Sequence, residues 1–313
     1  MNRPVSSTDL HDAAPSGPRI ALFVEDGSGD WHARRLKRAM EARGAHVVTT
    51  TLSSCAFDTS CASGLDIPGF NGMLPDGAFV RSVSTGTLEQ ITFRLGILHA
   101  LRESGVRVWN DARAIERCVD KSTATFLFQK AGLPTPPTRV VETRVRAYAH
   151  LASDPRPFVV KPLFGSQGNG VRRAEGPDEL PPPEDVGDVY YMQHYLRHAD
   201  ATQFEDWRVF VSQGRILSSM VRRGKTWITN VHQGAEPIAH DPCAEMSALA
   251  LGAVVAIGAD YAGVDLIRDQ SGKLMLLEIN SNPAWKGLQS VSAADIADTL
   301  AADFLSTVTK APV

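Results

Sequence analysis

The chain has 313 residues, of which 43% are hydrophobic and 21% charged, a composition typical of a globular protein with about two domains. Its net charge of −3 and its pI near 6.3 provide no basic field that would hold nucleic acid or an anionic membrane surface. The longest apolar stretch, residues 248–259, is too short to cross about 30 Å of hydrocarbon. We therefore expect a protein that binds neither nucleic acid nor membranes.

The cysteines and the N-terminal segment both favour a cytoplasmic protein. The cysteines show no C-x-x-C pair and no histidine at zinc spacing, so free thiols are expected in place of disulfides or a zinc site. They are Cys55, Cys61, Cys118 and Cys243. Residues 1–18 contain no apolar run of about 7 to 15 residues, so we interpret them as a disordered arm and not as a signal peptide.

Residues 19–112 alternate between strand and helix patterns, which is typical of a Rossmann-like α/β domain with a parallel sheet. A Gly/Pro/Ser-rich stretch at residues 53–77 interrupts the alternation and predicts an irregular excursion. The predicted strands are 20–24, 46–51, 78–83 and 106–109, and the predicted helices are 31–43 and 88–103.

The remainder divides into a predicted central subdomain, residues 113–190, and a C-terminal subdomain, residues 191–313. A helix at 113–131 ends at Gly132 and is followed by several prolines, which cannot continue a helix. A second α+β unit, 140–189, comes next and includes a polar loop at 177–188. Later strands are predicted at 189–193, 207–211, 215–222, 263–268 and 273–280, and helices near 244–259 and 293–307.

A strand that ends at Lys161 runs into the glycine-rich stretch 165–170, which includes Ser166, Gln167 and Gly168. The glycines could serve turn geometry alone, or they could expose backbone N–H groups that wrap an anion while Lys161 adds a positive charge. A Walker loop is excluded because the lysine precedes the glycines. A mobile hairpin that closes over phosphates fits this order better.

The apolar strand near the C-terminus carries Glu278 and Asn280 two positions apart, so both side chains point to one face. Asp265 lies in the preceding apolar strand, and a short connection would pair the two strands as a hairpin. Such converging oxygens suit Mg²⁺. The alternative is that Glu278 faces solvent and an arginine pairs with Asp265. Because a lone buried carboxylate is costly, we favour the metal.

Other polar residues are ambiguous when taken singly. Lys121 lies on a predicted helix, where lysines usually face water. Asp206 and Arg208 are two positions apart on a strand, which suits a ribose hydroxyl and a phosphate, although an exposed ion pair fits equally. Further donors for carboxylate or phosphate, or else a solvated basic turn, are Arg222, Arg223, Asn230 and His232.

Six motifs, taken in chain order, resemble the ATP-grasp superfamily and most closely its RimK-type glutamate ligases. They are DKST at 120–123, VVKPLFGSQGNGV at 159–171, YMQHYL at 191–196, DWR at 206–208, AGVDLI at 262–267 and LLEINSNP at 276–283. The resemblance covers roughly residues 79–305. It implies an ATP-grasp fold, α/β and α+β, preceded by a Rossmann-like domain.

The resemblance also implies roles for individual residues. Lys121 and Lys161 would contact the ATP phosphates, residues 166–168 would form the lid, and Asp206 would hold the ribose. The adenine hinge would be Gln193, His194, Tyr195 and Leu196, with Asn230 a further nucleotide-binding residue. Two Mg²⁺ or Mn²⁺ ions would bind Asp265, Glu278 and Asn280. Arg208 and Arg222 would be catalytic, and Arg81 could bind a substrate carboxylate. Related ligases often carry Glu at position 194 and Arg at position 228, where this chain has His194 and Ile228.

The implied reaction transfers the γ-phosphate of ATP to a carboxylate, and an amine then attacks the acyl phosphate to form an amide. We expect L-glutamate to be added to a small coenzyme, for example a pterin or furan derivative, or to a protein tail. The alternatives are a kinase that phosphorylates a hydroxyl and a nucleotide-binding regulatory protein without turnover. Because related ligases often form dimers or tetramers, we expect a homo-oligomer.

Overall fold

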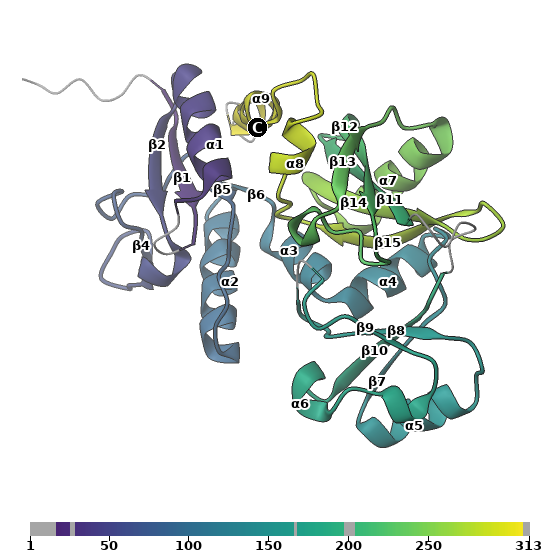
Figure 1. The fold of residues 1–313 in the computed structure, drawn as a ribbon. Helices are drawn as coiled ribbons and strands as arrows, with labels where there is room; N and C mark the ends of the chain where they lie inside the picture. Colours follow the sequence, from purple (N-terminus) through teal and green to yellow (C-terminus); the bar gives the residue numbers. More distant parts are fainter. Residues whose placement is uncertain (1–16, 26–28, 166–167, 197–203, 309–313) are drawn as a thin grey trace, which may run out of the picture.

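A computed structural model describes residues 17–25, 29–165, 168–196 and 204–308. Most of the predicted N-terminal arm, and lid residues Ser166 and Gln167, lie outside these ranges. Figure 1 shows an N-terminal domain on the left, a C-terminal region on the right, and a central domain below the C-terminal region. Within the described ranges, no helix is both long and apolar enough to cross a membrane.

The N-terminal domain is built on a parallel sheet in the order β2-β1-β5-β6, as the alternation of strands and helices predicted. Its strands are β1 (Arg19–Phe23), β2 (His46–Thr50), β5 (Gly77–Val80) and β6 (Arg107–Trp109), and its helices are α1 (Trp31–Ala42) and α2 (Leu88–Glu103). β1 and β5 are buried on both faces, as expected of central strands in a parallel sheet. The excursion contains a short hairpin, β3 (Ala56–Phe57) and β4 (Leu65–Asp66).

The helix predicted at 113–131 is two helices, α3 (Ala112–Val119) and α4 (Lys121–Lys130). The break falls at Asp120, which has extended backbone and whose carboxylate accepts the backbone N–H groups of Ser122 and Thr123. An aspartate that caps the following turn in this way starts a new helix. The prediction of one continuous helix was therefore wrong, because it ignored this capping signal.

The central domain is an antiparallel sheet in the order β7-β10-β8-β9 with its own core. Its elements are β7 (Thr138–Glu142), α5 (Arg144–Ala152), β8 (Phe158–Lys161), β9 (Arg172–Ala174), α6 (Pro183–Val186) and β10 (Val189–His194). The stretch predicted as a polar loop, 177–188, contains α6 and one 3₁₀ turn, Pro177–Glu179. The central core includes Phe158, Val160, Tyr190 and Met192 and lies within residues 141–192.

The C-terminal region is an antiparallel sheet in the order β13-β12-β11-β14-β15, covered on one face by α7. The strands are β11 (Phe204–Ser212), β12 (Arg215–Gly224), β13 (Glu236–Ala239), β14 (Tyr261–Arg268) and β15 (Leu274–Asn280). The helices are α7 (Ala244–Ile257), α8 (Lys286–Gln289) and α9 (Ile296–Val308). β14 and β15 form the predicted hairpin.

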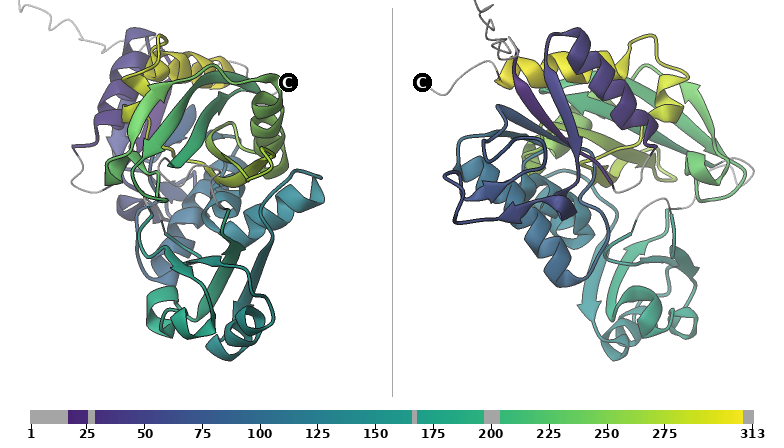
Figure 2. Two further views of the ribbon diagram at one scale, coloured as in Figure 1. Left: turned by 45° about the vertical axis from the view of Figure 1, so that its right-hand side comes forward. Right: turned by 90° about the vertical axis from the view of Figure 1, so that its left-hand side faces the viewer.

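The last helix returns to the first domain. α9 lies against α1, and ion pairs join Arg35 to Asp295 and Arg43 to Asp298 across the two helices (Figure 2). Beneath them is one continuous core, which we call the shared core. It includes Ile20, Leu22, Leu36 and Phe79 of the N-terminal domain and Phe210, Tyr261, Trp285 and Phe304 of the C-terminal region. The N-terminal domain and the C-terminal region are thus packed as one body.

Candidate functional site

A cavity of about 160 Å³ lies between the central domain and the C-terminal sheet. From the central domain its lining includes Lys161, Gly168, Gln193, His194, Tyr195 and Leu196. From α4, the C-terminal sheet and the loop between β12 and β13 it includes Lys121, Asp206, Arg222, Asn230, Asp265 and Glu278. The fold therefore brings most of the sequence-predicted site residues together. Arg208 and Asn280 lie beside the cavity, each bonded to one of its lining residues.

Two lysines form the positive wall of the cavity. The Nζ of Lys161 donates to Gln193 Oε1 at 2.9 Å, and the Nζ of Lys121 donates to the carbonyls of Leu163 and Gly165 at 3.1 and 3.0 Å. Burial lowers the pKa of both ammonium groups, and the charge of Glu278 opposes that shift. Both lysines therefore present charge in a site that is poorly solvated.

The opposite wall carries the carboxylates of the β14–β15 hairpin. Asp265 and Glu278 are direct cross-strand partners, and Asn280 Nδ2 donates to Glu278 Oε1 at 3.1 Å. Asp265 also receives the Nε and Nη2 of Arg208, and Nη2 of Arg222 lies 2.9 Å from its Oδ2. Burial alone would raise the pKa of Asp265, but the two guanidinium groups lower it to about 2. The arginine pairing that was the alternative to a metal is thus present.

Asp206 is almost fully buried and makes a two-point ion pair with Arg222. Burial disfavours the charged form of Arg222, but Asp206 and Asp265 outweigh that effect and raise its pKa above the ordinary value. Arg222 therefore stays charged and links two carboxylates on neighbouring strands. Both carboxylate oxygens of Asp206 already accept from this guanidinium, so the predicted contact with ribose would share the carboxylate with Arg222.

The predicted adenine hinge begins with Gln193 and His194, the last two residues of β10. The side-chain amide of Gln193 is bonded to Lys161 and also lies 3.2 Å from the hydroxyls of Thr138 and Tyr191. The ring of His194 bonds Asp154 at 3.2 Å and packs edge-on against Phe158. These two side chains therefore hold the hinge to the central domain.

Of the loop between β12 and β13, sequence reasoning named Ile228 and Asn230 but missed that Trp227 and Thr229 also line the cavity. Trp227, Ile228 and Thr229 line it between β12 and β13, and Trp227 meets Tyr195 edge to face with ring centroids 5.8 Å apart. A Cβ at Gly168 would lie 3.1 Å from Ile228 Cγ2, and the φ of +76° independently requires glycine. The available signal in the sequence was the apolar pair Trp227 and Ile228 within a polar turn. This signal does not indicate which residues the pair contacts.

The chain is similar in sequence to ligases of one family. The profile of the RimK-like ATP-grasp domain matches residues 118–304. The tetrahydromethanopterin:alpha-L-glutamate ligase of Methanococcus maripaludis is 30% identical over 297 residues, which cover 90% of this chain and 96% of that protein. A probable alpha-L-glutamate ligase of Thioalkalivibrio sulfidiphilus is 28% identical over 306 residues, covering 89% and 92% respectively.

Solved structures support the same fold. The ATP-grasp ligase PsnB, in complex with a precursor peptide and AMPPNP, superposes with a TM-score of 0.70 at 18% identity and covers 96% of this chain and 100% of its own. A RimK domain protein of Sphaerobacter thermophilus gives 0.64 at 20% identity, covering 92% and 99%. The predicted ATP-grasp fold is thereby confirmed. Fold and sequence agree that the chain is an ATP-grasp ligase and belongs to the RimK-like family, which includes the alpha-L-glutamate ligases.

Proposed function

We propose that this ligase uses ATP and Mg²⁺ to join the amino group of L-glutamate to a carboxylate of a small coenzyme, with a pterin derivative as the favoured acceptor. The observation that carries the proposal is the cavity with Lys121 and Lys161 on one wall and Asp265 and Glu278 on the other. The names of the relatives support the choice of glutamate and of a pterin.

In this proposal the two lysines bind the phosphates of ATP. Lys161 is now bonded to Gln193 and Lys121 to the carbonyls on either side of Phe164. Phosphate oxygens would replace these neutral acceptors by charged ones, and charge-assisted hydrogen bonds are about twice as strong. Lys121 would then release the base of the lid when ATP binds.

The donor set on the opposite wall fits a hard cation. Glu278 accepts one hydrogen bond from Asn280, which leaves further lone pairs on the carboxylate, and the donated Nδ2 leaves Oδ1 of Asn280 to act as a ligand. Both oxygens of Asp265 already contact guanidinium groups, so Asp265 has fewer lone pairs left for a metal ion and contributes mainly negative charge. Mg²⁺ accepts such carboxylate and carbonyl oxygens together with phosphates. Glu278 and Asn280 would hold the metal, and we expect two ions, which would neutralise the charge that develops on the β- and γ-phosphates.

The protein contributes position and electrostatics more than proton transfer. The acceptor carboxylate attacks the γ-phosphorus and ADP leaves. The glutamate amine then attacks the acyl phosphate carbon, and phosphate leaves as the amide forms. The buried guanidinium of Arg222 supplies fixed positive charge beside these steps. Gly168 and Ile228 approach each other in the cavity lining, and in this proposal their contact would help to exclude water, which hydrolyses acyl phosphates.

The test is an assay of ADP release with each of the twenty amino acids against pterin and furan carboxylates, with products identified by mass spectrometry. We expect ADP formation that requires both an acid and an amine, and a product heavier by one glutamyl residue. ADP released with an alcohol alone would establish a kinase. Nucleotide binding without turnover under every combination would establish a regulatory protein and reject the ligase proposal.

A further inference from the structure

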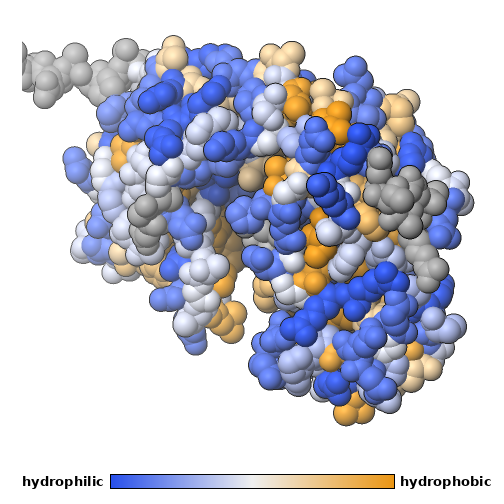
Figure 3. Space-filling view, viewed as in Figure 1, coloured by the Kyte–Doolittle hydropathy of each residue, from blue (hydrophilic) through white to orange (hydrophobic). Residues whose placement is uncertain are grey.

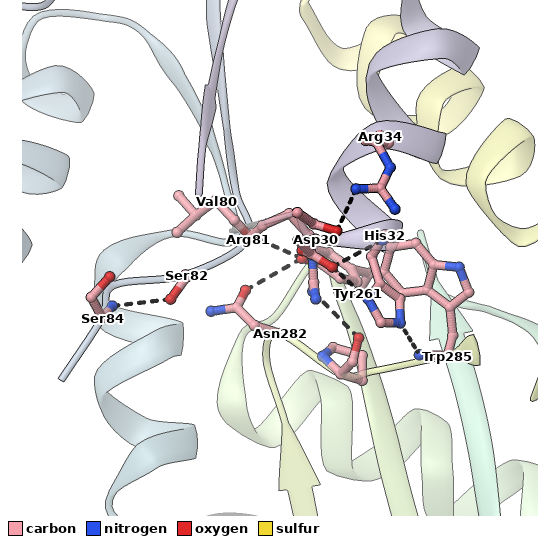
Figure 4. A network of polar contacts seen from close by, with 12 residues as sticks. Asp30, His32, Arg34, Val80, Arg81, Ser82, Ser84, Tyr261, Asn282 and Trp285 are labelled. Carbon is pink, nitrogen blue, oxygen red and sulfur yellow. Dashed lines mark hydrogen bonds and ion pairs between the residues drawn. The ribbon is translucent and has the colours of Figure 1, made fainter. Parts of the chain in front are cut away.

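The segment Ser281–Trp285, which directly follows β15, is contacted both by its own sheet, through Phe210 and Tyr261, and by the N-terminal domain. Figure 4 shows Arg81 and His32 of the N-terminal domain converging on this segment from one side, with Tyr261 of β14 beside it. The segment begins one residue after Asn280 and three after Glu278. Its position therefore fixes the end of the strand on which both residues lie.

The first half of the segment is anchored through backbone carbonyls. Asn110, which follows β6, donates from Nδ2 to the carbonyls of Ser281 and Tyr261 at 2.7 and 2.8 Å. Arg81, at the end of β5, donates from Nη1 to the carbonyl of Pro283 at 3.3 Å. The N-terminal domain thus holds both ends of the turn that leaves β15.

The second half is anchored by His32. Its Nδ1 lies 2.8 Å from Asp30 Oδ1, and its Nε2 lies 3.1 Å from the backbone nitrogen of Trp285. Because a backbone N–H can only donate, Nε2 must accept, and the ring proton therefore resides on Nδ1 and is donated to Asp30. The ring also packs edge-on against Trp285, with centroids 4.6 Å apart.

Asp30 is suited to fix this tautomer. Burial would raise the pKa of its carboxyl, but hydrogen bonds from His32 and the charge of Arg81 lower it to about 2. The carboxylate is therefore anionic under all ordinary conditions. It is bonded to both the backbone N–H and the ring of His32, which orients the imidazole at the first turn of α1. An anion that orients an imidazole is also how proteins orient histidines around metal centres.

Arg81 contacts the second half of the segment as well as the first. Its side chain is buried, its Nε is 3.7 Å from Asp30 Oδ2, and its guanidinium carbon lies 4.9 Å from the centroid of the Trp285 ring. Its Nε has no hydrogen-bond partner within the described residues. Arg81 therefore contacts the β15 segment, and the substrate carboxylate that the resemblance implied for it stays a prediction.

We propose that His32, oriented by Asp30 and supported by Arg81, is a positioning residue for the metal-binding end of β15, an inference that rests on the proposed Mg²⁺ site at Glu278 and Asn280. His32 holds the amide of Trp285, and the rigid turn of residues 281–285 passes that constraint to the ligand oxygens. Loss of the acceptor at Nε2 would let the turn relax and would misplace Asn280 and Glu278. The N-terminal domain would then tune metal affinity without contacting the metal.

The experiment compares His32→Ala with His32→Gln and with His99→Ala. The glutamine can carry an acceptor oxygen to about the place of Nε2. His99, on α2 of the N-terminal domain, is the matched control because it also pairs with a carboxylate, Glu116 of α3, and is partly exposed. The probe is ADP binding by calorimetry, with and without Mg²⁺, together with hydrogen exchange of residues 279–286 in the nucleotide-free protein.

We expect His32→Ala to weaken the Mg²⁺-dependent part of ADP binding about tenfold, to leave binding without Mg²⁺ unchanged, and to speed exchange at Trp285. His32→Gln should recover most of the loss, and His99→Ala should resemble the wild type. If His32→Ala does not fold, His32→Phe takes its place, since it keeps the ring contact and lacks the acceptor.

Two results separate failure of this inference from failure of the proposed function. Unchanged Mg²⁺-dependent binding in His32→Ala, with or without faster exchange, would mean that the network only joins the two domains and would overturn the inference. In the same assay Glu278→Ala should lose the Mg²⁺-dependent binding altogether. If Glu278→Ala retains it, the metal lies elsewhere and the proposed site itself is rejected.

Discussion

The C-terminal sheet contacts two neighbours, the N-terminal domain and the central domain, and the two interfaces are formed by different kinds of side chain. Towards the N-terminal domain it is closely packed and largely aromatic: Phe79, Trp109, Tyr261 and Phe304 pack with ring centroids 5.3 to 5.8 Å apart. Towards the central domain it is charged and hollow, with the cavity between the two. A closely packed aromatic interface resists deformation, whereas a cavity edged by glycines can open. We infer that the first interface fixes geometry and the second admits substrate.

The two hydrophobic cores support this distinction between a rigid interface and one that can open. The shared core draws side chains from both the N-terminal domain and the C-terminal region, while the central core lies within residues 141–192. Figure 3 shows the central domain as a separate lobe, set off from the rest of the surface by a recess. The body that carries Glu278 is therefore expected to stay rigid while the lobe that carries Lys161 moves.

The largest expected effect is at the charged wall of the rigid body. Glu278→Ala should reduce ADP release roughly a thousandfold or more, since the phosphates would lose their metal-mediated neutralisation. The melting temperature should stay near that of the wild type because Glu278 is partly exposed and faces the cavity. Steady-state kinetics and thermal denaturation measure both, and a normal kcat would remove Glu278 from the metal site.

Deleting one buried ring from each core tests whether the two bodies are independent. Phe304→Ala in the shared core and Phe158→Ala in the central core should each cost about 3 to 5 kcal/mol. Hydrogen exchange should then accelerate throughout the N-terminal domain and C-terminal sheet in the first variant, and mainly within residues 138–194 in the second. Equal acceleration over the whole chain in both variants would contradict the division into two bodies.

A smaller effect is expected at the aromatic interface in acid. The pKa of Asp30 is lowered from 3.8 to about 2 in the folded protein, so its ionisation stabilises the fold above the unfolded value, and this stabilisation is lost as pH falls towards about 2. Asp30→Asn should cost about 1 to 2 kcal/mol at neutral pH and should flatten the decline of stability below about pH 4. Urea denaturation across this pH range measures the slope. If Asp30→Asn loses stability in acid as steeply as the wild type, Asp30 contributes nothing to the pH dependence of stability.

The smallest effect is expected on the hinge of the mobile lobe. The ring of His194 is bonded to Asp154, so His194→Ala should change the KM for ATP by no more than about threefold, the range expected for a weak polar pair. Initial rates at varied ATP measure it. A tenfold rise in KM would show that the ring itself recognises the adenine base. We do not expect this, because related ligases often carry glutamate at position 194.

The sequence predicted the order of the elements, the parallel N-terminal sheet, the β14–β15 hairpin and the ATP-grasp fold. These depend on periodicity, turn residues and the spacing of motifs, which are local or recur along the chain. The proximity of Glu278 to Asn280 follows from strand periodicity alone. The break at Asp120 was also within reach, since aspartate followed by Ser122 and Thr123 has the character of a helix cap.

What could not be predicted depends on partners that are remote along the chain. The bond from His32 to Trp285 joins residues 253 positions apart, and the pairing of Arg222 with Asp265 requires the order of β11, β12 and β14. The spacing of Asp206 and Arg208 suggested that the two would act together. Instead Asp206 pairs with Arg222 of β12, and Arg208 pairs with Asp265 of β14. Cross-strand neighbours lie closer together than residues two apart on one strand.

The contact between α1 and α9 limits how this enzyme can be recombined with its relatives. A chimera cut near residue 112 would take α1 from one parent and α9 from the other, and would mismatch both the apolar surface and the Arg35–Asp295 and Arg43–Asp298 pairs. Transplanting the first domain together with residues 281–308 would keep that interface intact. A graft of the first domain should therefore be made in two pieces, residues 19–112 and residues 281–308, taken from the same relative.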